Sequence, residues 1–410
     1  MIRAAIVGCG KMADQHASQI RKICSATLVA ACDAEPLMAK QLAERFDIPV
    51  WFTDIDEMLA SVRPDVVHVT TPPQSHLQIG KKCVKAGANA YIEKPFTLNT
   101  ADAMELIELA DRSGVKLTAG HNGQFTHAMN QMRRLVADGF LGGRAVHMES
   151  LYCYEFGDPA YAKALLGDCD HWSRKLPGSL LQNIMSHGVS RIAEFMTGEK
   201  IEVLAHGFSS RFLKEIGQAD IIDELRLIIT DENATTAHFT FSSQIAPTQH
   251  QFRVYGPKRS LIVDDDHQVL LRLENEEYKS YLRFFVPPVV FARQYIGNLA
   301  RNMGRFAKND FHLPNEAGLL TLITSFYECI AHGAAPPISY REILLTSQIM
   351  DAAFEQIRGD KQEAPIQTLN VEMDAADETR VGSGIRYPAT SRKGHSGGRP
   401  VSARNSDFQS

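Results

Sequence analysis

Short apolar runs alternate with amphipathic stretches over the first third of the chain. Ile2–Val7 and Ala26–Cys32 are dominated by apolar residues, which is typical of strands buried on both faces. Between such runs, stretches such as Pro36–Phe46 repeat apolar residues at helical spacing. This alternation predicts a parallel, doubly wound α/β sheet. Ligands of such sheets bind at the carboxyl ends of the strands.

The pattern changes after Asn122, where strands follow one another without long helices between them. This clustering predicts a second domain of the α+β type with a mostly antiparallel sheet. We therefore place one domain at residues 1–122, a second at 123–358, and a polar tail at 359–410 that we expect to be disordered. The strands predicted in the second domain are 145–154, 201–208, 225–230, 237–242, 251–255, 260–264 and 269–273, and the helices are 127–138, 179–196, 316–330 and 340–357.

Composition and charge exclude several classes of protein. The net charge of −5 is mild, so it favours neither nucleic acid nor an anionic membrane as a partner. The seven Cys form no C-x-x-C pair, which suits reduced thiols in a cytoplasmic protein. We see no signal peptide and no apolar run near the ~18 residues that a membrane helix needs. The nearest run, 284–291, is broken by Pro; an exposed patch or an interface segment is possible, but a buried bend is favoured.

A glycine turn follows the first strand and opens a helix. Gly8, Gly10 and Ala13 stand in the pattern G-x-G-x-x-A, with Lys11 and Met12 between them. Gly8 would permit the tight turn, Gly10 would let a pyrophosphate approach the backbone, and Ala13 would let the helix pack against the strand. The diphosphate would bind the free N–H groups at the helix N-terminus. The turn therefore predicts a dinucleotide site, against the alternative of a purely structural turn.

Asp33 ends the second strand about twenty residues after the turn, as the dinucleotide pattern requires. Its carboxylate can accept hydrogen bonds from both adenosine ribose hydroxyls and would repel a 2′-phosphate. The residues that follow include no Arg or Lys to receive such a phosphate. NAD is therefore favoured over NADP.

Further polar residues fall at predicted strand ends or on one helix face. Lys94 could donate a hydrogen bond to a substrate oxygen, and desolvation would lower its pKa into the range useful for acid–base work. Asn183 and His187 are four residues apart and would share a helix face. The imidazole could take a hydroxyl proton, but a lone His on a helix is more often an ordinary core or surface residue. His76 either lines the nicotinamide region or caps the next helix. Asp168-Cys169-Asp170-His171 is too crowded for a known metal spacing, so we expect a polar loop and no metal.

Several motifs occur in the order seen in the Gfo/Idh/MocA oxidoreductases, which the sequence resembles up to about residue 359. They are the glycine turn, Asp33, Thr71-Pro72-Pro73-x-x-His76, Glu93-Lys94-Pro95, Gly139-Phe140-Leu141-Gly142, Trp172-Ser173-Arg174, the helix from Gly178 to His187, and Pro336-Pro337-Ile338-Ser339. The resemblance implies a Rossmann domain followed by a substrate-binding domain with a large open sheet. It also implies homodimers or homotetramers, and NAD(P)-linked oxidation of a secondary alcohol on a sugar, polyol or related compound.

The resemblance assigns roles to individual residues. The catalytic Lys and His of the family fall on Lys94 and His187. The usual Asp falls on Asn183, which can orient a substrate but cannot take a proton, and the usual Gly falls on Met185, which would narrow the pocket. The expected cofactor-binding residues are Gly8, Gly10, Lys11, Met12, Ala13, Asp33, Thr71, Pro72, His76, Glu93 and Lys94, and the expected substrate-binding residues are Asn183, Trp172, Arg174, His121 and Asn122.

Because position 183 holds Asn in place of the usual Asp, two alternatives to a dehydrogenase stay open. One is an NAD-dependent sugar lyase or glycosidase that oxidises its substrate transiently and then returns the hydride. The other is a non-catalytic, NAD-binding regulatory protein.

Overall fold

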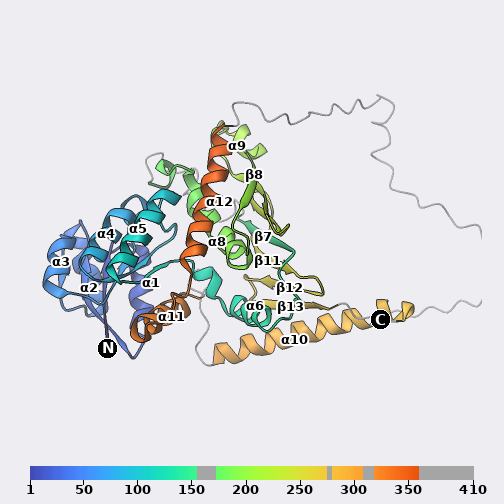
Figure 1. The fold of residues 1–410 in the computed structure, drawn as a ribbon, viewed down its shortest axis with the longest axis horizontal. Coiled ribbons are helices and arrows are strands. Elements are labelled where there is room, and N and C mark those ends of the chain that lie inside the picture. The colour runs from blue at the N-terminus through green and yellow to red at the C-terminus, as the bar shows by residue number, and fades with distance from the viewer. Residues whose placement is uncertain (155–171, 275–278, 308–317, 360–410) are drawn as a thin grey trace, which may run out of the picture. The chain divides into compact units, whose positions relative to one another are not determined.

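Two sheets organise the protein in its computed structural model, which describes residues 1–154, 172–274, 279–307 and 318–359 (Figure 1). The polar tail predicted at 359–410 lies outside this part of the chain from residue 360 onward, and so does the polar loop predicted at 168–171.

The first sheet is parallel throughout and has six strands in the order β3-β2-β1-β4-β5-β6. This confirms the predicted doubly wound sheet. The strand order reverses direction between β1 and β4, which is the point where such sheets bind ligands. The strands are β1 (Ile2–Val7), β2 (Ala26–Cys32), β3 (Trp51–Phe52), β4 (Val66–Val69), β5 (Asn89–Ile92) and β6 (Leu117–Ala119), and the helices between them are α1 (Lys11–Ile20), α2 (Pro36–Phe46), α3 (Ile55–Val62), α4 (His76–Lys85) and α5 (Thr100–Ser113).

Helix α11 (Leu319–His332) packs into the core of the first sheet, although it comes late in the chain. A buried chain of hydrogen bonds fastens it there: the Tyr327 hydroxyl bonds His68 Nε2 at 2.7 Å, His68 Nδ1 bonds His16 Nδ1 at 2.8 Å, and His16 Nε2 bonds Glu93 at 3.0 Å. Burial, and then the neighbouring His16, lowers the pKa of His68 well below its ordinary value, so His68 is neutral. The chain ends at the Glu93 carboxylate, which can only accept, so His16 Nε2 carries a hydrogen.

The second sheet has seven strands in the order β13-β12-β11-β7-β10-β9-β8. Only the β7–β10 pair is parallel, which confirms the mostly antiparallel prediction. Helices α8 (Ser179–Phe195) and α12 (Tyr340–Gly359) pack together in its core (Figure 1). The strands are β7 (His147–Cys153), β8 (Ile201–Phe208), β9 (Glu224–Asp231), β10 (Thr236–Ser242), β11 (Gln249–Tyr255), β12 (Arg259–Asp264) and β13 (Val269–Glu274), with the helices α6 (His127–Ala137) and α9 (Arg211–Glu215) beside them.

The buried bend favoured for residues 284–291 is wrong. Phe284 is 81% exposed, and the segment opens the long helix α10 (Val286–Ala307). The two Pro residues fall in the first turn of α10, where no intrahelical N–H bond is lost. The side-chain amides of Gln294 and Asn298 hydrogen-bond the backbone of the edge strand β13, at Arg272 and Leu270. The polar face of α10 therefore covers the sheet edge. No helix in the described ranges is long and apolar enough to cross a membrane.

Gly8 and Gly10 meet different constraints in the turn after β1. Gly8 has a φ of +90°, and a Cβ there would lie 2.6 Å from Thr71 Cγ2 and 2.7 Å from the Thr71 backbone nitrogen. A Cβ on Gly10 would meet no atom within 4 Å. Of these two positions, only position 8 requires glycine on account of the protein's own atoms.

We predict that Gly8→Ala lowers the free energy of unfolding and that Gly10→Ala leaves it close to that of the wild type. The positive φ alone costs about 1–2 kcal/mol for a residue with a Cβ, and the collision with Thr71 adds to this cost. Urea unfolding of both variants measures the difference. Equal stability of the two variants would contradict the prediction.

Candidate functional site

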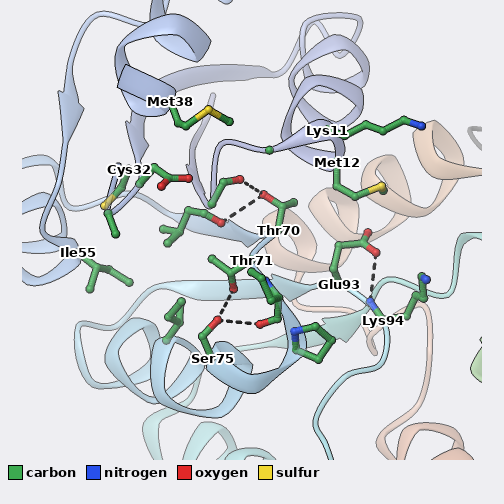
Figure 2. Close-up of a pocket in the computed structure, with 18 of the residues that line it drawn as sticks. Lys11, Met12, Cys32, Met38, Ile55, Thr70, Thr71, Ser75, Glu93 and Lys94 are labelled. Carbon is green, nitrogen blue, oxygen red and sulfur yellow. Dashed lines mark hydrogen bonds between the residues drawn. The ribbon is translucent and has the colours of Figure 1, made fainter. Parts of the chain in front are cut away.

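A cleft of about 790 Å³ follows the carboxyl ends of strands β1 to β5 (Figure 2). Residues that follow five strands converge on it, because parallel strands end at the same edge of the sheet. Nine of the eleven residues predicted to bind the cofactor line this cleft: Gly8, Gly10, Lys11, Met12, Asp33, Thr71, Pro72, Glu93 and Lys94.

The other two predicted cofactor residues, Ala13 and His76, lie behind the cleft wall. Ala13 is a fully buried residue of helix α1. The ring nitrogens of His76 each lie 2.9 Å from a backbone carbonyl oxygen, one of Thr71 and one of Pro95. His76 thus connects two of the strand-end loops and shapes the cleft from outside.

The glycine turn and Asp33 offer groups that fit a dinucleotide. Asp33 accepts hydrogen bonds from the backbone N–H of Cys9 at 2.6 Å and of Glu35 at 2.9 Å, which fix its carboxylate at the cleft. No side chain caps the N-terminus of α1, and the space beside Gly10 is open. A diphosphate fits the uncapped helix end, and a ribose diol fits Asp33.

A second pocket of about 370 Å³ adjoins the cleft and shares Lys11, Met12, Glu93, Lys94 and Asn183 with it. Its other walls come from α1, segment 122–126, α8 and the second sheet with its turns. The two domains therefore build this site together. In the part of the chain that the structure describes, no three His, Cys, Asp or Glu residues are grouped to hold a metal ion.

Lys94 and Asn183 meet where the cleft joins the second pocket. Lys94 Nζ donates hydrogen bonds to the side-chain oxygen of Asn183 at 2.9 Å and to its backbone carbonyl at 3.1 Å. Burial lowers the pKa of Lys94, and the charge of Glu93 opposes this shift. The Asn183 amide carries no charge, so it holds the ammonium group in place without the stabilisation that a carboxylate would add.

Glu93 lies behind Lys94 and stays ionised. One carboxylate oxygen accepts from His16, and the other accepts from the backbone N–H of Lys94 at 3.2 Å. Burial raises the pKa of Glu93, but the hydrogen bond from His16 and the nearby charges outweigh burial and lower it overall. The buried His–Tyr chain thus ends beside the Lys94 backbone and fixes its position.

His187 lines the second pocket one helical turn after Asn183, as their spacing predicted. Its ring stacks on Tyr152 with the ring centroids 5.7 Å apart. Burial, and then the charge of Lys94, lowers the pKa of His187 well below its ordinary value. The ring is therefore neutral near pH 7 and can accept a proton.

The remaining predicted substrate residues lie in several places. Asn122 lines the second pocket, whereas His121 is buried against a small separate cavity. Burial lowers the pKa of His121 to about 4. Trp172 and Arg174 belong to a short 3-10 helix, Trp172–Lys175, before α8. Met185 packs in the hydrophobic core of the second domain rather than narrowing the pocket.

Sequence reasoning missed the pocket wall that the second sheet provides. Arg191 could have been found, because it lies one turn beyond His187 on the same helix face. The wall residues of the second sheet are brought together by strand pairings between residues about a hundred positions apart, such as His250 with Tyr152, which no local pattern reveals. Gln15 on α1, and Gly123 and Thr126 just before α6, were missed as well. The missed residues are Gln15, Gly123, Thr126, Tyr152, Tyr154, Arg191, His250, Asp265, Asp266 and Gln268.

Known proteins with curated functions resemble this chain over most of its length. D-apiose dehydrogenase of Paraburkholderia graminis is 23% identical over 93% of this chain and 94% of its own. Myo-inositol 2-dehydrogenase of Thermotoga maritima is 21% identical over 75% of this chain and 88% of its own.

Solved structures share the fold. An oxidoreductase from Agrobacterium radiobacter, in complex with NAD⁺, L-tartaric acid and magnesium, matches 88% of this chain and 97% of its own with a TM-score of 0.66 at 13% identity. Myo-inositol 2-dehydrogenase from Lactobacillus plantarum matches 87% of this chain and 97% of its own with a TM-score of 0.65 at 16% identity.

Two family models match the two domains in turn. Residues 2–121 match the oxidoreductase family with an NAD-binding Rossmann fold, and residues 129–262 match the GFO/IDH/MocA C-terminal domain. Together with the strand order and the nucleotide cleft, these matches establish that the chain belongs to the Gfo/Idh/MocA family of NAD(P)-dependent oxidoreductases.

Proposed function

We propose that this protein is an NAD-dependent dehydrogenase that oxidises a secondary alcohol of a sugar, polyol or sugar derivative. The observation that carries this proposal is the position of Lys94, whose ammonium group stands between the nucleotide cleft and a polar pocket. The relatives named for D-apiose and myo-inositol support the substrate class.

Three side chains of the protein have separate roles at the alcohol that is oxidised. When bound, the nicotinamide ring supplies the hydride acceptor. Lys94 donates a hydrogen bond to the alcohol oxygen, and neutral His187 accepts the hydroxyl proton as the C–O bond becomes a carbonyl. Asn183 keeps the ammonium group pointed into the pocket. The protein aligns these groups and keeps part of the water out of the site.

The cofactor preference rests on Asp33. Its carboxylate is fixed by two backbone N–H groups, so it cannot turn away from a 2′-phosphate. Its neighbours along the cleft wall, Ala34 and Met38, carry no positive charge. Repulsion of the phosphate therefore favours NAD over NADP.

We predict that Lys94→Ala lowers kcat/KM by at least about 100-fold, the effect of losing one acid–base group, and leaves NAD affinity within about threefold. The assay follows NADH formation from NAD, and separately from NADP, with D-apiose, myo-inositol, a D-glucoside and UDP-N-acetylglucosamine. Lys40→Ala is the matched control, because Lys40 lies on the exposed side of α2. Full activity of Lys94→Ala would remove Lys94 from the mechanism.

The same assay separates the alternatives. Product that forms without NADH accumulation would point to transient oxidation by a lyase or glycosidase. NAD binding with no product from any wild-type reaction in the panel would point to a regulatory protein.

We predict that Asn183→Asp raises the upper pH limit of activity by about one pH unit. A carboxylate within hydrogen-bond distance favours the charged ammonium and raises the pKa of Lys94. Because protonated Lys94 is the active donor, activity should persist to higher pH in the variant. A pH profile of kcat/KM tests this, and an alkaline limb at the wild-type position would contradict it.

We also infer that the chain forms homo-oligomers through helix α10. Six of its exposed apolar residues recur at alternating spacings of three and four, which is the seam of a coiled coil, and Val290 and Tyr295 are exposed beside them. Arg301 and Arg305 lie on the opposite side of the helix, so two copies can pair seam to seam without opposing these charges. The seam comprises Val289 (67% exposed), Ala292, Ile296 (66%), Leu299 (58%), Met303 (63%) and Phe306 (73%).

We predict that Leu299→Glu reduces the molar mass of the wild-type oligomer, because it buries a charge in the seam. Light scattering after size-exclusion chromatography measures the mass. Arg301→Glu, on the opposite face of α10, should leave it unchanged. A monomeric wild type, or an unchanged mass of Leu299→Glu, would contradict the inference.

A further inference from the structure

His250 presents an unused nitrogen to the second pocket. It lies on β11 and lines the pocket wall opposite the first domain's loops. Its Nε2 atom is buried and has no hydrogen-bond partner among the described residues. A buried polar atom without a partner costs about 1–3 kcal/mol. A ligand group that satisfied this nitrogen would recover that cost.

Asp266 determines which hydrogen the His250 ring carries. One carboxylate oxygen accepts from His250 Nδ1 at 2.7 Å, and the other accepts from the backbone N–H of His250 at 2.8 Å. A carboxylate can only accept, so Nδ1 must carry the hydrogen. In the neutral ring, Nε2 is then a hydrogen-bond acceptor directed at the pocket.

The Asp266 carboxylate bonds His250, and a different carboxylate bonds Arg191. Arg191 and the Thr126 hydroxyl donate to the neighbouring residue Asp265. Burial raises the pKa of Asp266, but the hydrogen bond from His250 outweighs burial and lowers it overall. Asp266 therefore remains a carboxylate in the range where the enzyme would work.

The groups around His250 come from the end of strand β7 and from helix α8. The rings of Tyr152 and Tyr154, at the end of β7, lie 4.2 and 5.0 Å from the His250 ring between centroids. His187 of α8 stacks on Tyr152. Arg191, also of α8, has two buried nitrogens, Nε and Nη1, without a hydrogen-bond partner among the described residues. An acceptor and two donors thus remain unused in one polar pocket.

We propose that His250 and Arg191 form a subsite that binds a second hydroxyl of the substrate, apart from the hydroxyl that is oxidised. A hydroxyl group can donate to Nε2 of His250 and accept from the Arg191 guanidinium at the same time. This subsite, which rests on the proposed dehydrogenase function, selects polyols and sugars with a free hydroxyl at that position. It thereby decides which carbon faces Lys94.

Asp266→Asn tests the subsite because it reverses the hydrogen-bonding role of Nε2 at nearly constant shape. An amide has only one oxygen, and the backbone N–H of His250 requires it. The amide NH₂ must then face Nδ1, which becomes the acceptor, and Nε2 must carry the hydrogen. The substrate hydroxyl, the Arg191 guanidinium and Nε2 would then all be donors, and the hydroxyl would lose the acceptor for its hydrogen.

We expect Asp266→Asn to lower kcat/KM at least about tenfold, mainly by raising KM, with NAD affinity unchanged. Asp264→Asn is the matched control. Asp264 makes the same pair of bonds with His267 in the same turn, to the ring Nδ1 at 2.9 Å and the backbone N–H at 3.1 Å, but His267 is exposed and lies outside the pocket. Equal effects of the two substitutions, or wild-type kcat/KM in Asp266→Asn, would overturn the subsite.

Nitrogen-15 NMR of the His250 ring gives a readout that needs no turnover. The wild type should show hydrogen on Nδ1, the Asp266→Asn variant should show it on Nε2, and the wild-type Nε2 signal should shift when myo-inositol or D-apiose is added to the NADH-saturated protein. If no substrate is oxidised but this signal shifts, the dehydrogenase proposal fails and the subsite stands. If NADH forms but the signal stays fixed with the oxidised substrate, the subsite fails alone. The wild-type measurement decides even if the variant does not fold.

Discussion

The contact between Lys94 and Asn183 is the interaction on which the site depends. It joins the loop after β5 to helix α8, so it connects the nucleotide cleft of one domain to the pocket wall of the other. Burial works against the ammonium charge, and an ammonium group without hydrogen-bond acceptors would lose its proton in such a place. The two oxygens of Asn183 keep the group charged and aimed, while Glu93 supplies the nearby negative charge.

Hydrogen bonds in the core of the first domain also hold the loop that carries Lys94. Glu93 is held by His16, which bonds His68, which bonds Tyr327 of the late helix α11. The position of the loop that carries Lys94 thus depends on a segment more than two hundred residues later in the chain. Replacing any one of these hydrogen-bonded side chains destabilises the protein, because it leaves a buried polar atom of its neighbour without a partner.

Most residues that line the cleft could be picked out from the sequence, because the patterns that mark them are local. The glycine turn, Asp33 and Glu93-Lys94 each follow a strand of a parallel sheet, and the ends of parallel strands meet at one edge. The strands of the second sheet were also predicted, since each is a short apolar run. The pocket wall that they build could not be predicted, because His250 reaches Tyr152 through strand pairing across about a hundred residues. Helix α10 was misread because its apolar residues face outward while its amides bind the sheet edge.

In the proposed reaction, a hydride passes from a substrate carbon in the second pocket to the cofactor in the cleft. The most direct test uses a sugar or polyol that the wild-type protein oxidises, prepared with deuterium on the carbon that bears the reacting hydroxyl. Mass spectrometry of the cofactor after a single turnover should find the deuterium on the reduced nicotinamide. Oxidised product formed together with NADH that carries no deuterium would contradict this direct hydride transfer.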